Sequence, residues 1–214
     1  MSRPLLPSPA CPAVHGRLGA LLDHLDTRSL HEQRIVVTGG TGFFGYWLLS
    51  LFDLLHRQGV ALKVCVLSRS PTAFLARAPF LADAPWLDWQ QGDIKDFGAL
   101  PPADLLIHAA TDTDADAHRH PLAIMDDILL GTRHTLERAR EAGVRRALYV
   151  SSGAVYGRQP ADVAHVPEDA AFACDALHPG SAYGEAKRAA EQWCLQYGLQ
   201  HDIAIPVARC FAFV

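Results

Sequence analysis

The glycine-rich segment of this chain reads Ile35-Val36-Val37-Thr38-Gly39-Gly40-Thr41-Gly42-Phe43-Phe44-Gly45. A β-branched run, a glycine cluster and a helical stretch follow one another, which predicts a strand, a tight turn and a helix. Gly39 permits the turn, Gly42 lets backbone amides approach a pyrophosphate, and Gly45 lets the helix pack closely on the strand. The helix N-terminus adds partial positive charge and N–H donors for phosphate. The segment therefore predicts a dinucleotide-binding turn, with candidate cofactor contacts at Gly39, Thr41, Gly42, Phe43, Phe44 and Gly45.

Strands and helices alternate around this segment. Expected strands are Arg34–Thr38, Leu62–Leu67, Leu87–Gln90, Leu105–His108, Ala147–Ser151 and Ile203–Ala208. Expected helices are 14–30, Phe43–Arg57, Leu122–Ala142 and Ala182–Tyr197. Strands that are apolar throughout are buried on both faces, and crossovers between parallel strands are right-handed. The order therefore predicts an α/β protein with a doubly wound parallel sheet, a Rossmann fold.

The two ends of the chain differ from this alternating region. Prolines at positions 4, 7, 9 and 12 predict a disordered start, and leucines at helical spacing predict a short helix after it. Residues 1–30 are thus expected to precede a single NAD(P)-binding domain over residues 31–214. The last residues, 209–214, continue an apolar segment directly after a strand, as expected of a truncated or incomplete copy.

The composition argues against several classes of protein. With a net charge of −4, the chain lacks the basic character of a nucleic-acid-binding protein. No apolar run reaches the roughly 18 residues of a membrane-spanning helix, and the start has neither the basic nor the apolar region of a signal peptide. Five cysteines without a paired spacing predict a reduced, cytoplasmic setting. No nucleic-acid or membrane partner is expected.

The end of the second strand bears on the choice of cofactor. Dinucleotide sites often place a carboxylate there to bind the ribose 2′-hydroxyl of NAD. In this chain the strand is followed by Ser68-Arg69-Ser70, so no carboxylate is present. Arg69 can pair with a 2′-phosphate while Ser68 adds a hydrogen bond. This end therefore favours NADP, with NAD as the alternative.

The third and fourth strands end in further candidate contacts. Asp93, in Gly92-Asp93-Ile94, either meets the adenine amino group together with Ile94 or caps a turn. His108-Ala109-Ala110 leaves the fourth strand with small residues where the backbone must approach a cofactor. Because ligands of doubly wound sheets bind at the carboxyl ends of the strands, these segments are expected to meet the glycine turn.

Hydroxyl and amine groups follow the fifth strand. Ser151 and Ser152 could hydrogen-bond a substrate oxygen or cap a turn. Tyr183 and Lys187 lie four residues apart on a predicted helix and share one face. An ammonium beside a phenol stabilises the phenolate and lowers the pKa of the tyrosine, which favours proton transfer near neutral pH.

Together these motifs resemble the extended short-chain dehydrogenase/reductase family, the group of NAD(P)-dependent nucleotide-sugar epimerases, dehydratases and reductases. The matching motifs are Thr38-Gly39-x-x-Gly42-x-x-Gly45, Gly92-Asp93-Ile94, His108-Ala109-Ala110, Ser151-Ser152-x-x-Val155-Tyr156-Gly157 and Tyr183-x-x-x-Lys187. Their order and spacing resemble the family from residue 33 to the last residue. The serine-containing motif is similar to the signature of enzymes like UDP-galactose 4-epimerase.

The resemblance implies roles for three residues. Tyr183 would be the acid/base that moves the proton of a sugar hydroxyl as hydride passes to the nicotinamide. Lys187 would hold the nicotinamide ribose hydroxyls and depress the pKa of the tyrosine. Ser152 would hydrogen-bond the reacting oxygen. These residues are therefore the candidate catalytic set, and Tyr183 and Lys187 are also candidate cofactor contacts.

The chain departs from the family pattern in three places. Dehydratases of the family carry Thr-Asp-Glu where this chain has Ser152-Gly153-Ala154, which favours epimerase or ketoreductase chemistry over dehydration. Ile128 replaces an asparagine that family members often carry in the helix after the fourth strand. The C-terminal substrate-binding portion, expected after the sixth strand, is largely absent. The oligomeric state stays open: related folds often dimerise through paired helices, and a homodimer of this kind would involve residues 121–142 and 182–198.

Two alternative functions stay open at this point. One is a carbonyl reductase of the same family that acts on a non-sugar substrate. The other is a catalytically silent, truncated dinucleotide-binding module.

A few other residues invite functional interpretations. The run of Asp112, Asp114, Asp116, His118 and His120 lacks a recognised ligand spacing and is expected to be a solvated loop, with no metal. Trp86 and Trp89 are expected to pack beside the third strand. Tyr156 is expected either to touch the nicotinamide or substrate, or to be a buried structural residue.

Overall fold

A six-stranded parallel sheet forms the centre of the computed structural model, which describes residues 4–111 and 119–211. The sheet order is β3-β2-β1-β4-β5-β6. The strands are β1 (Gln33–Thr38), β2 (Leu62–Ser68), β3 (Leu87–Gln91), β4 (Leu105–His108), β5 (Arg146–Ser152) and β6 (Val207–Cys210). Each neighbouring pair is parallel. This order confirms the predicted doubly wound Rossmann fold.

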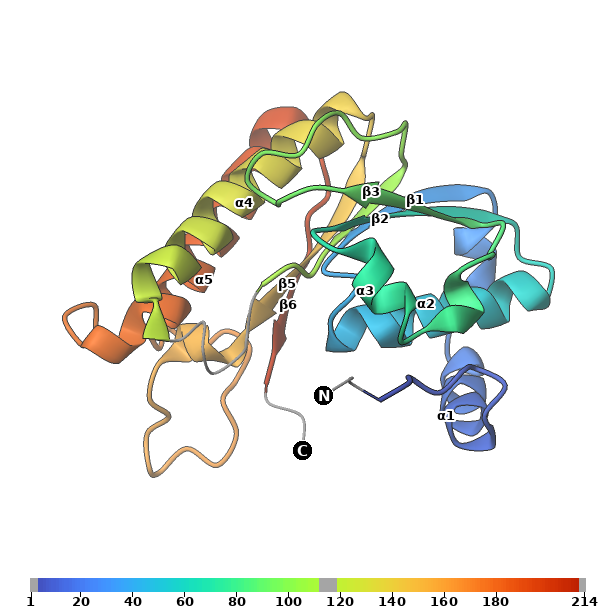
Figure 1. Cartoon of the computed structure of the whole chain (residues 1–214). Coiled ribbons are helices and arrows are strands. Elements are labelled where there is room, and N and C mark those ends of the chain that lie inside the picture. Colours follow the sequence, from blue (N-terminus) through green and yellow to red (C-terminus); the bar gives the residue numbers. More distant parts are fainter. Residues whose placement is uncertain (1–3, 112–118, 212–214) are drawn as a thin grey trace.

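Helices cover both faces of the sheet (Figure 1). They are α1 (Pro12–Leu22), α2 (Phe43–Arg57), α3 (Pro71–Leu75), α4 (Pro121–Glu141) and α5 (Ala182–His201). In Figure 1, α4 and α5 lie along one side of the sheet, and α2 and α3 lie on the other. Short 3-10 helices occur at Thr27–Leu30, Pro79–Leu81, Gly153–Tyr156 and Pro179–Ser181. Within the described ranges, no helix is long and apolar enough to cross a bilayer.

The alternation of side chains along β1 builds two hydrophobic cores. Ile35 and Val37 pack in the core that contains α1 and α2 residues, whereas Val36 packs in the core that contains α4 and α5 residues. Successive side chains of a strand point to opposite faces of the sheet. Residues 35–37 of the strand are therefore all apolar, because both faces of the sheet are buried there.

Three element boundaries differ by four or more residues from those predicted, and one of them is the end of α5, expected at Tyr197 and found at His201. The sixth strand was expected at Ile203–Ala208 but runs from Val207 to Cys210. Before it, Ala204 makes only an isolated bridge to Arg146, and Pro206, which has no N–H donor, precedes the continuous ladder. The expected helix over 14–30 ends at Leu22. A separate 3-10 helix follows at Thr27–Leu30, where the Asp26 side chain accepts a hydrogen bond from the Arg28 amide.

The proline-rich segment, expected to be disordered, makes defined contacts over residues 4–11. The Leu6 amide donates to the Arg77 carbonyl oxygen at 2.7 Å, and the Tyr46 hydroxyl donates to the Pro7 carbonyl oxygen at 2.9 Å. Leu6 also packs against the core beside α2. These contacts hold the segment in place, although its prolines exclude regular secondary structure.

Candidate functional site

A cleft of about 1040 Å³ lies at the carboxyl edge of the sheet. The chain order reverses between β1 and β4, so the segments that follow these two strands diverge there. The predicted site residues that line the cleft are Gly39, Thr41, Gly42, Phe43, Phe44, Ser68, Arg69, Asp93, Ile94, Ala109, Ala110, Ser152, Tyr183 and Lys187. The structure thus brings residues from both halves of the chain to one cavity.

The glycine turn has the backbone that its sequence requires. Gly39 has a φ of +75°, in the left-handed region that favours glycine, and a Cβ there would lie 2.5 Å from the Ala109 carbonyl carbon. Gly42 is the N-cap residue of α2. Because glycine has no side chain, no side-chain hydrogen bond caps this end of the helix. A helix N-terminus of this kind attracts phosphate through its partial positive charge.

Gly45 is not among the described residues that line the cleft, and its expected cofactor contact stays a prediction. A Cβ at Gly45 would lie 2.2 Å from the carbonyl carbon and oxygen of Gly40. Only hydrogen at this position lets the first turn of α2 rest on the turn that follows β1. This is the close helix packing that the sequence predicted for the third glycine.

His108 likewise lies behind the cleft and not on its described surface. Its side chain is buried, with Nδ1 at 2.7 Å from the Thr38 hydroxyl and Nε2 at 3.0 Å from the Thr132 hydroxyl. Burial, reinforced by the Lys187 charge, lowers the pKa of His108 to about 3. The imidazole is therefore a neutral link between β1, β4 and α4, and the expected cofactor contact of His108 stays a prediction.

The end of β2 carries hydroxyl and guanidinium groups. Ser68, Arg69 and Ser70 line the cleft, and the Ser68 hydroxyl accepts a hydrogen bond from the Ser70 amide at 3.2 Å. Arg77, which the sequence did not single out, lines the same end, and its backbone is held by Leu6. Of the described residues 68–77 that line the cleft, none is a carboxylate.

Asp93 has the turn role considered for it, and its contact with adenine stays a prediction. It lines the cleft, and its Oδ1 accepts a hydrogen bond from the Lys95 amide at 3.0 Å, as a turn residue does. Its neighbour Ile94 also lines the cleft and packs so closely on α4 that a Cβ at Gly131 would lie 2.7 Å from it. The segment after β3 thus forms one wall of the cavity and packs closely on α4.

Ser152, Tyr183 and Lys187 meet at the other end of the cleft. The Ser152 hydroxyl oxygen accepts a hydrogen bond from the Ala154 amide at 3.1 Å and hydrogen-bonds the Tyr183 phenol. Lys187 is 3% exposed, and its ammonium donates to the Thr111 hydroxyl at 2.7 Å and the Val150 carbonyl oxygen at 3.0 Å. A serine, a phenol and an ammonium are therefore held together by contacts within the protein.

The effect of Lys187 on Tyr183 differs from the sequence prediction. Burial raises the pKa of Tyr183, and the hydrogen bond with Ser152 acts in the opposite direction. The Lys187 ammonium contacts Thr111 and Val150 and lies 5.0 Å from the centre of the Tyr149 ring. Burial also lowers the pKa of Lys187 itself, to about 8. The predicted lowering of the tyrosine pKa by the lysine is thus absent from this arrangement.

Several lining residues were missed from the sequence. Thr111, Asp127, Cys210 and Phe211 line the cleft. Thr111 follows the fourth strand directly, and its polar side chain at that edge was the available signal. Asp127 pairs with Lys95 at 2.5 Å, a contact between distant segments that no local pattern marks.

Three other expectations have definite outcomes. Ile128, at the position where family members often have asparagine, lies on α4 and is buried in the core. Tyr156 is buried, and its hydroxyl donates to the Glu168 carbonyl oxygen at 3.2 Å, which supports the structural alternative. Trp86 and Trp89 pack against Phe52 and Phe74, respectively.

The Asp/His run falls mostly outside the described residues. Asp112, Asp114, Asp116 and His118 lie in the undescribed segment 112–118, and His120 is exposed just before α4. Over residues 4–111 and 119–211, no group of histidine, cysteine and acidic side chains is arranged to hold a metal ion.

Comparisons with known proteins agree with this architecture. The model of the NAD dependent epimerase/dehydratase family matches residues 35–214. GDP-6-deoxy-D-mannose reductase of Pseudomonas aeruginosa is 31% identical and covers 84% of this chain and 52% of its own. UDP-glucose 4-epimerase of Yersinia pestis is 29% identical and covers 74% of this chain and 46% of its own.

Solved structures show the same likeness. The crystal structure of a UDP-galactose 4-epimerase matches with a TM-score of 0.64 at 31% identity, over 82% of this chain and 55% of that one. The dTDP-glucose 4,6-dehydratase DesIV of Streptomyces venezuelae, with NAD and TYD bound, matches with a TM-score of 0.69 at 27% identity, over 83% of this chain and 55% of its own. The chain spans about half the length of these relatives. It belongs to the NAD dependent epimerase/dehydratase family.

Proposed function

We propose that the full-length protein is an NAD(P)-dependent oxidoreductase or epimerase that acts on a nucleotide-linked sugar by hydride transfer, assisted by Ser152, Tyr183 and Lys187. The observation that carries the proposal is that these side chains share one cleft with the glycine turn. Two relatives are named as enzymes of nucleotide-linked sugars, a reductase of GDP-6-deoxy-D-mannose and an epimerase of UDP-glucose.

The cleft suits a nicotinamide dinucleotide. The turn at Gly39 leaves no room for a Cβ, and the uncapped start of α2 at Gly42 suits a pyrophosphate. Arg69 stands at the adenosine end of the cleft, and Lys187 at the nicotinamide end would hold the ribose hydroxyls. When bound, the dinucleotide supplies a hydride donor and acceptor.

The chain's own residues would move and hold the proton. The raised pKa of Tyr183 keeps its phenol protonated at neutral pH, so it can donate a proton to a carbonyl oxygen that becomes a hydroxyl. Ser152 accepts the Ala154 amide with its oxygen, and its single hydrogen, which serves Tyr183 in this structure, would be donated to the reacting oxygen when substrate is bound.

The reaction type proposed is epimerisation or reduction. Gly153 and Ala154, at the start of the 3-10 helix after β5, carry no side-chain acid beside Ser152. An elimination of water needs a group that removes a carbon-bound proton and one that protonates the leaving hydroxyl. The sequence of this segment therefore supports chemistry that proceeds with one acid/base.

We further propose a preference for NADP, with NAD as the alternative. The support is the pair of arginines, Arg69 and Arg77, and the lack of a carboxylate among the described cleft-lining residues 68–77 that follow β2. A guanidinium pairs strongly with a phosphate and gains nothing comparable from a ribose 2′-hydroxyl.

The Arg69→Ala variant of the full-length protein is expected to bind NADPH about 10- to 100-fold more weakly, because a charge-assisted hydrogen bond contributes about 1.5–3 kcal/mol. Its affinity for NADH should stay within about twofold. Fluorescence titration with each cofactor measures both. Arg28→Ala, which removes a side chain that is 95% exposed elsewhere, is the matched control. An equal loss for the two cofactors would contradict the proposed 2′-phosphate contact.

The function itself is tested by assaying the full-length protein on a panel of UDP-, GDP- and dTDP-linked sugars with NADPH, NADP, NADH and NAD. Reduction changes the absorbance of the nicotinamide, and epimerisation changes the sugar, which chromatography resolves. Turnover of one nucleotide sugar is the expected result. A protein that binds NADPH but converts no nucleotide sugar would refute the proposal.

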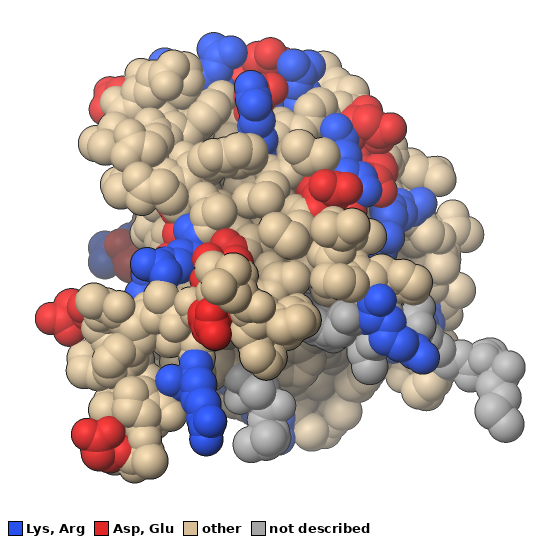
Figure 2. All heavy atoms as spheres, turned by 90° about the vertical axis from the view of Figure 1, so that its left-hand side faces the viewer, with Lys and Arg blue, Asp and Glu red and all other residues tan. Residues whose placement is uncertain are grey.

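We also propose a homodimer and a reducing, cytoplasmic setting. Figure 2 shows the face over α4 and α5, where residues other than Lys, Arg, Asp and Glu form most of the surface. Leu122, Leu130, Leu195 and Leu199 are exposed large apolar residues on these two helices. Sedimentation of the full-length protein as a single chain would contradict the dimer.

The five cysteines are free thiols, which supports the proposed reducing, cytoplasmic setting. Cell fractionation tests that location.

A further inference from the structure

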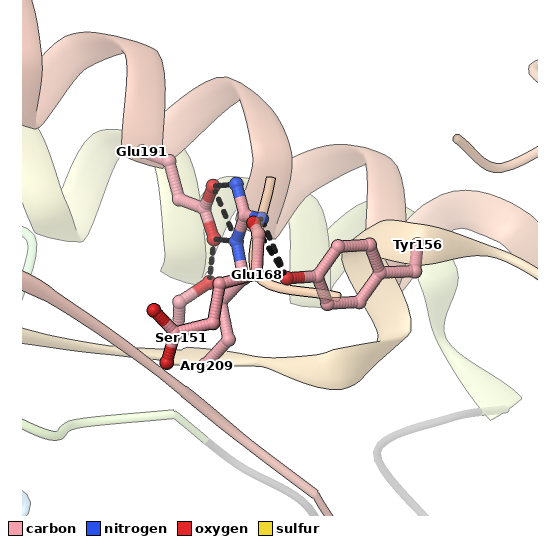
Figure 3. Close-up of polar contacts among 5 residues, drawn as sticks. All are labelled: Ser151, Tyr156, Glu168, Glu191 and Arg209. Carbon is pink, nitrogen blue, oxygen red and sulfur yellow. Dashed lines mark hydrogen bonds and ion pairs between the residues drawn. The ribbon is translucent and has the colours of Figure 1, made fainter. Parts of the chain in front are cut away.

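A polar network joins α5 to β5 and β6 beside the candidate catalytic residues (Figure 3). Glu191 of α5 accepts a hydrogen bond from the Ser151 hydroxyl at 2.6 Å. Arg209 of β6 donates to the same carboxylate through Nε at 3.0 Å and Nη2 at 2.7 Å. Its Nη1 donates to the Tyr156 hydroxyl at 2.9 Å. Each donor group of the guanidinium therefore has a named partner in the protein.

The network lies next to the candidate catalytic residues in the chain. Glu191 follows Lys187 by four residues and Tyr183 by eight, so the three side chains share one face of α5. Ser151 directly precedes Ser152 at the end of β5. The strand end and the helix are thus connected twice, by Ser151 to Glu191 and by Ser152 to Tyr183.

The Glu191–Arg209 pair tolerates little displacement. The Glu191 side chain is 10% exposed and that of Arg209 is 33% exposed. A carboxylate this buried is costly unless its partners keep good geometry, and a planar guanidinium that binds both carboxylate oxygens fixes direction as well as distance. Arg209 also lies against the Tyr156 ring, at 4.8 Å from its centre. The pair can therefore fix the position of α5 relative to β6.

We propose that Glu191 and Arg209 are positioning residues, which hold the Tyr183–Lys187 face of α5 against Ser152 and set the charge that surrounds Lys187. The proposal rests on the proposed function for the roles of these three residues. It assigns to the pair no contact with the substrate or the cofactor.

The electrostatic part of the proposal follows from the surroundings of Lys187. The described titratable groups that act on it, or on which it acts, come from four elements: His108 on β4, Tyr149 on β5, Cys210 on β6, and Glu191 and Cys194 on α5. Burial lowers the pKa of Lys187, and the negative charge of Glu191 opposes that effect. Arg209 in turn neutralises much of the Glu191 charge. The two residues should thus influence Lys187 in opposite directions.

Removing each partner separately tests this opposition. In Glu191→Gln the ammonium loses a nearby negative charge, so Lys187 is expected to release its proton at lower pH, by about one unit. In Arg209→Gln the Glu191 charge is no longer neutralised, so the titration of Lys187 is expected to move to higher pH. If the pair had only a structural role, the pH at which Lys187 titrates would shift in the same direction in both variants, or would shift in neither.

The measurement is NMR titration of the full-length protein labelled with ¹³C and ¹⁵N in lysine, which needs no substrate. The signal missing from Lys187→Arg identifies Lys187, while Lys63 and Lys95 serve as internal references. Glu137→Gln is the matched control, because it removes a carboxylate from the exposed Arg133–Glu137 pair of α4. An unchanged Lys187 titration in Glu191→Gln, or equal shifts in both variants, would overturn the electrostatic role.

Steady-state kinetics test the positioning role. Arg209→Lys keeps the positive charge but loses the planar guanidinium, so the Lys187 titration should stay near that of the wild type while kcat falls about tenfold or more. The KM for the cofactor should not change. Wild-type kcat in Arg209→Lys would overturn the positioning role. Absence of turnover in the wild-type protein would instead refute the proposed function, and the NMR result would still decide the electrostatic role.

Discussion

The Tyr183→Phe variant of the full-length protein is expected to lose about 10²- to 10⁴-fold in kcat, the range that a positioned acid/base contributes. The change removes one oxygen from a side chain that is otherwise retained, so the ring still fills its place between α5 and the end of β5. Its affinity for NADPH should stay within about twofold, because the pyrophosphate and adenosine contacts lie at the glycine turn and the end of β2. Stopped-flow turnover and fluorescence titration measure the two quantities.

Tyr197→Phe is the matched control for this change. Tyr197 lies on the same helix, and its hydroxyl accepts a hydrogen bond from Arg140 at 3.2 Å, outside the described lining of the cleft. Its loss should leave kcat unchanged. If Tyr183→Phe kept wild-type kcat, or lost cofactor affinity as severely as turnover, Tyr183 would not be the acid/base.

The predicted site residues that the structure brings to the cleft are those whose position follows from local rules. The turn at Gly39 needs a positive φ, which glycine adopts without strain, and the apolar strand before it needs two covered faces. Parallel strands then bring their carboxyl ends to one edge, so Ser152 after β5 and Ala109 after β4 meet the turn. The order of the strands is therefore enough to predict which segments form most of the cleft.

The contacts that sequence could not predict join distant segments. Lys187 donates to Thr111, which precedes it by 76 residues, and no local pattern in the sequence marks this long-range contact. His108 ends a strand as a site residue would, yet two threonine hydroxyls from β1 and α4 hold it in the core. No periodicity or turn pattern encodes such pairings, because they depend on how the helices pack on the sheet.

The Gly45→Ala variant is expected to lower the free energy of unfolding by about 3 kcal/mol. The added Cβ would lie 2.2 Å from the carbonyl carbon and oxygen of Gly40 and 2.3 Å from its Cα. These are backbone atoms, so no change of rotamer relieves the overlap. Helix α2 must move away from the turn, and Gly42, its N-cap, must move with it. NADPH affinity should therefore fall together with stability.

Gly19→Ala separates this steric effect from the general consequence of replacing glycine in a helix. Gly19 lies inside α1, and a Cβ there would have no neighbour within 4 Å. Alanine is favoured over glycine inside a helix by about 0.5–1 kcal/mol, so this variant should be slightly more stable than the wild type. Urea denaturation followed by circular dichroism gives both free energies for the full-length protein. Because the two substitutions are chemically identical, opposite signs would assign the loss in Gly45→Ala to the contact with Gly40. A Gly45→Ala variant as stable as Gly19→Ala would show that α2 does not depend on that close approach.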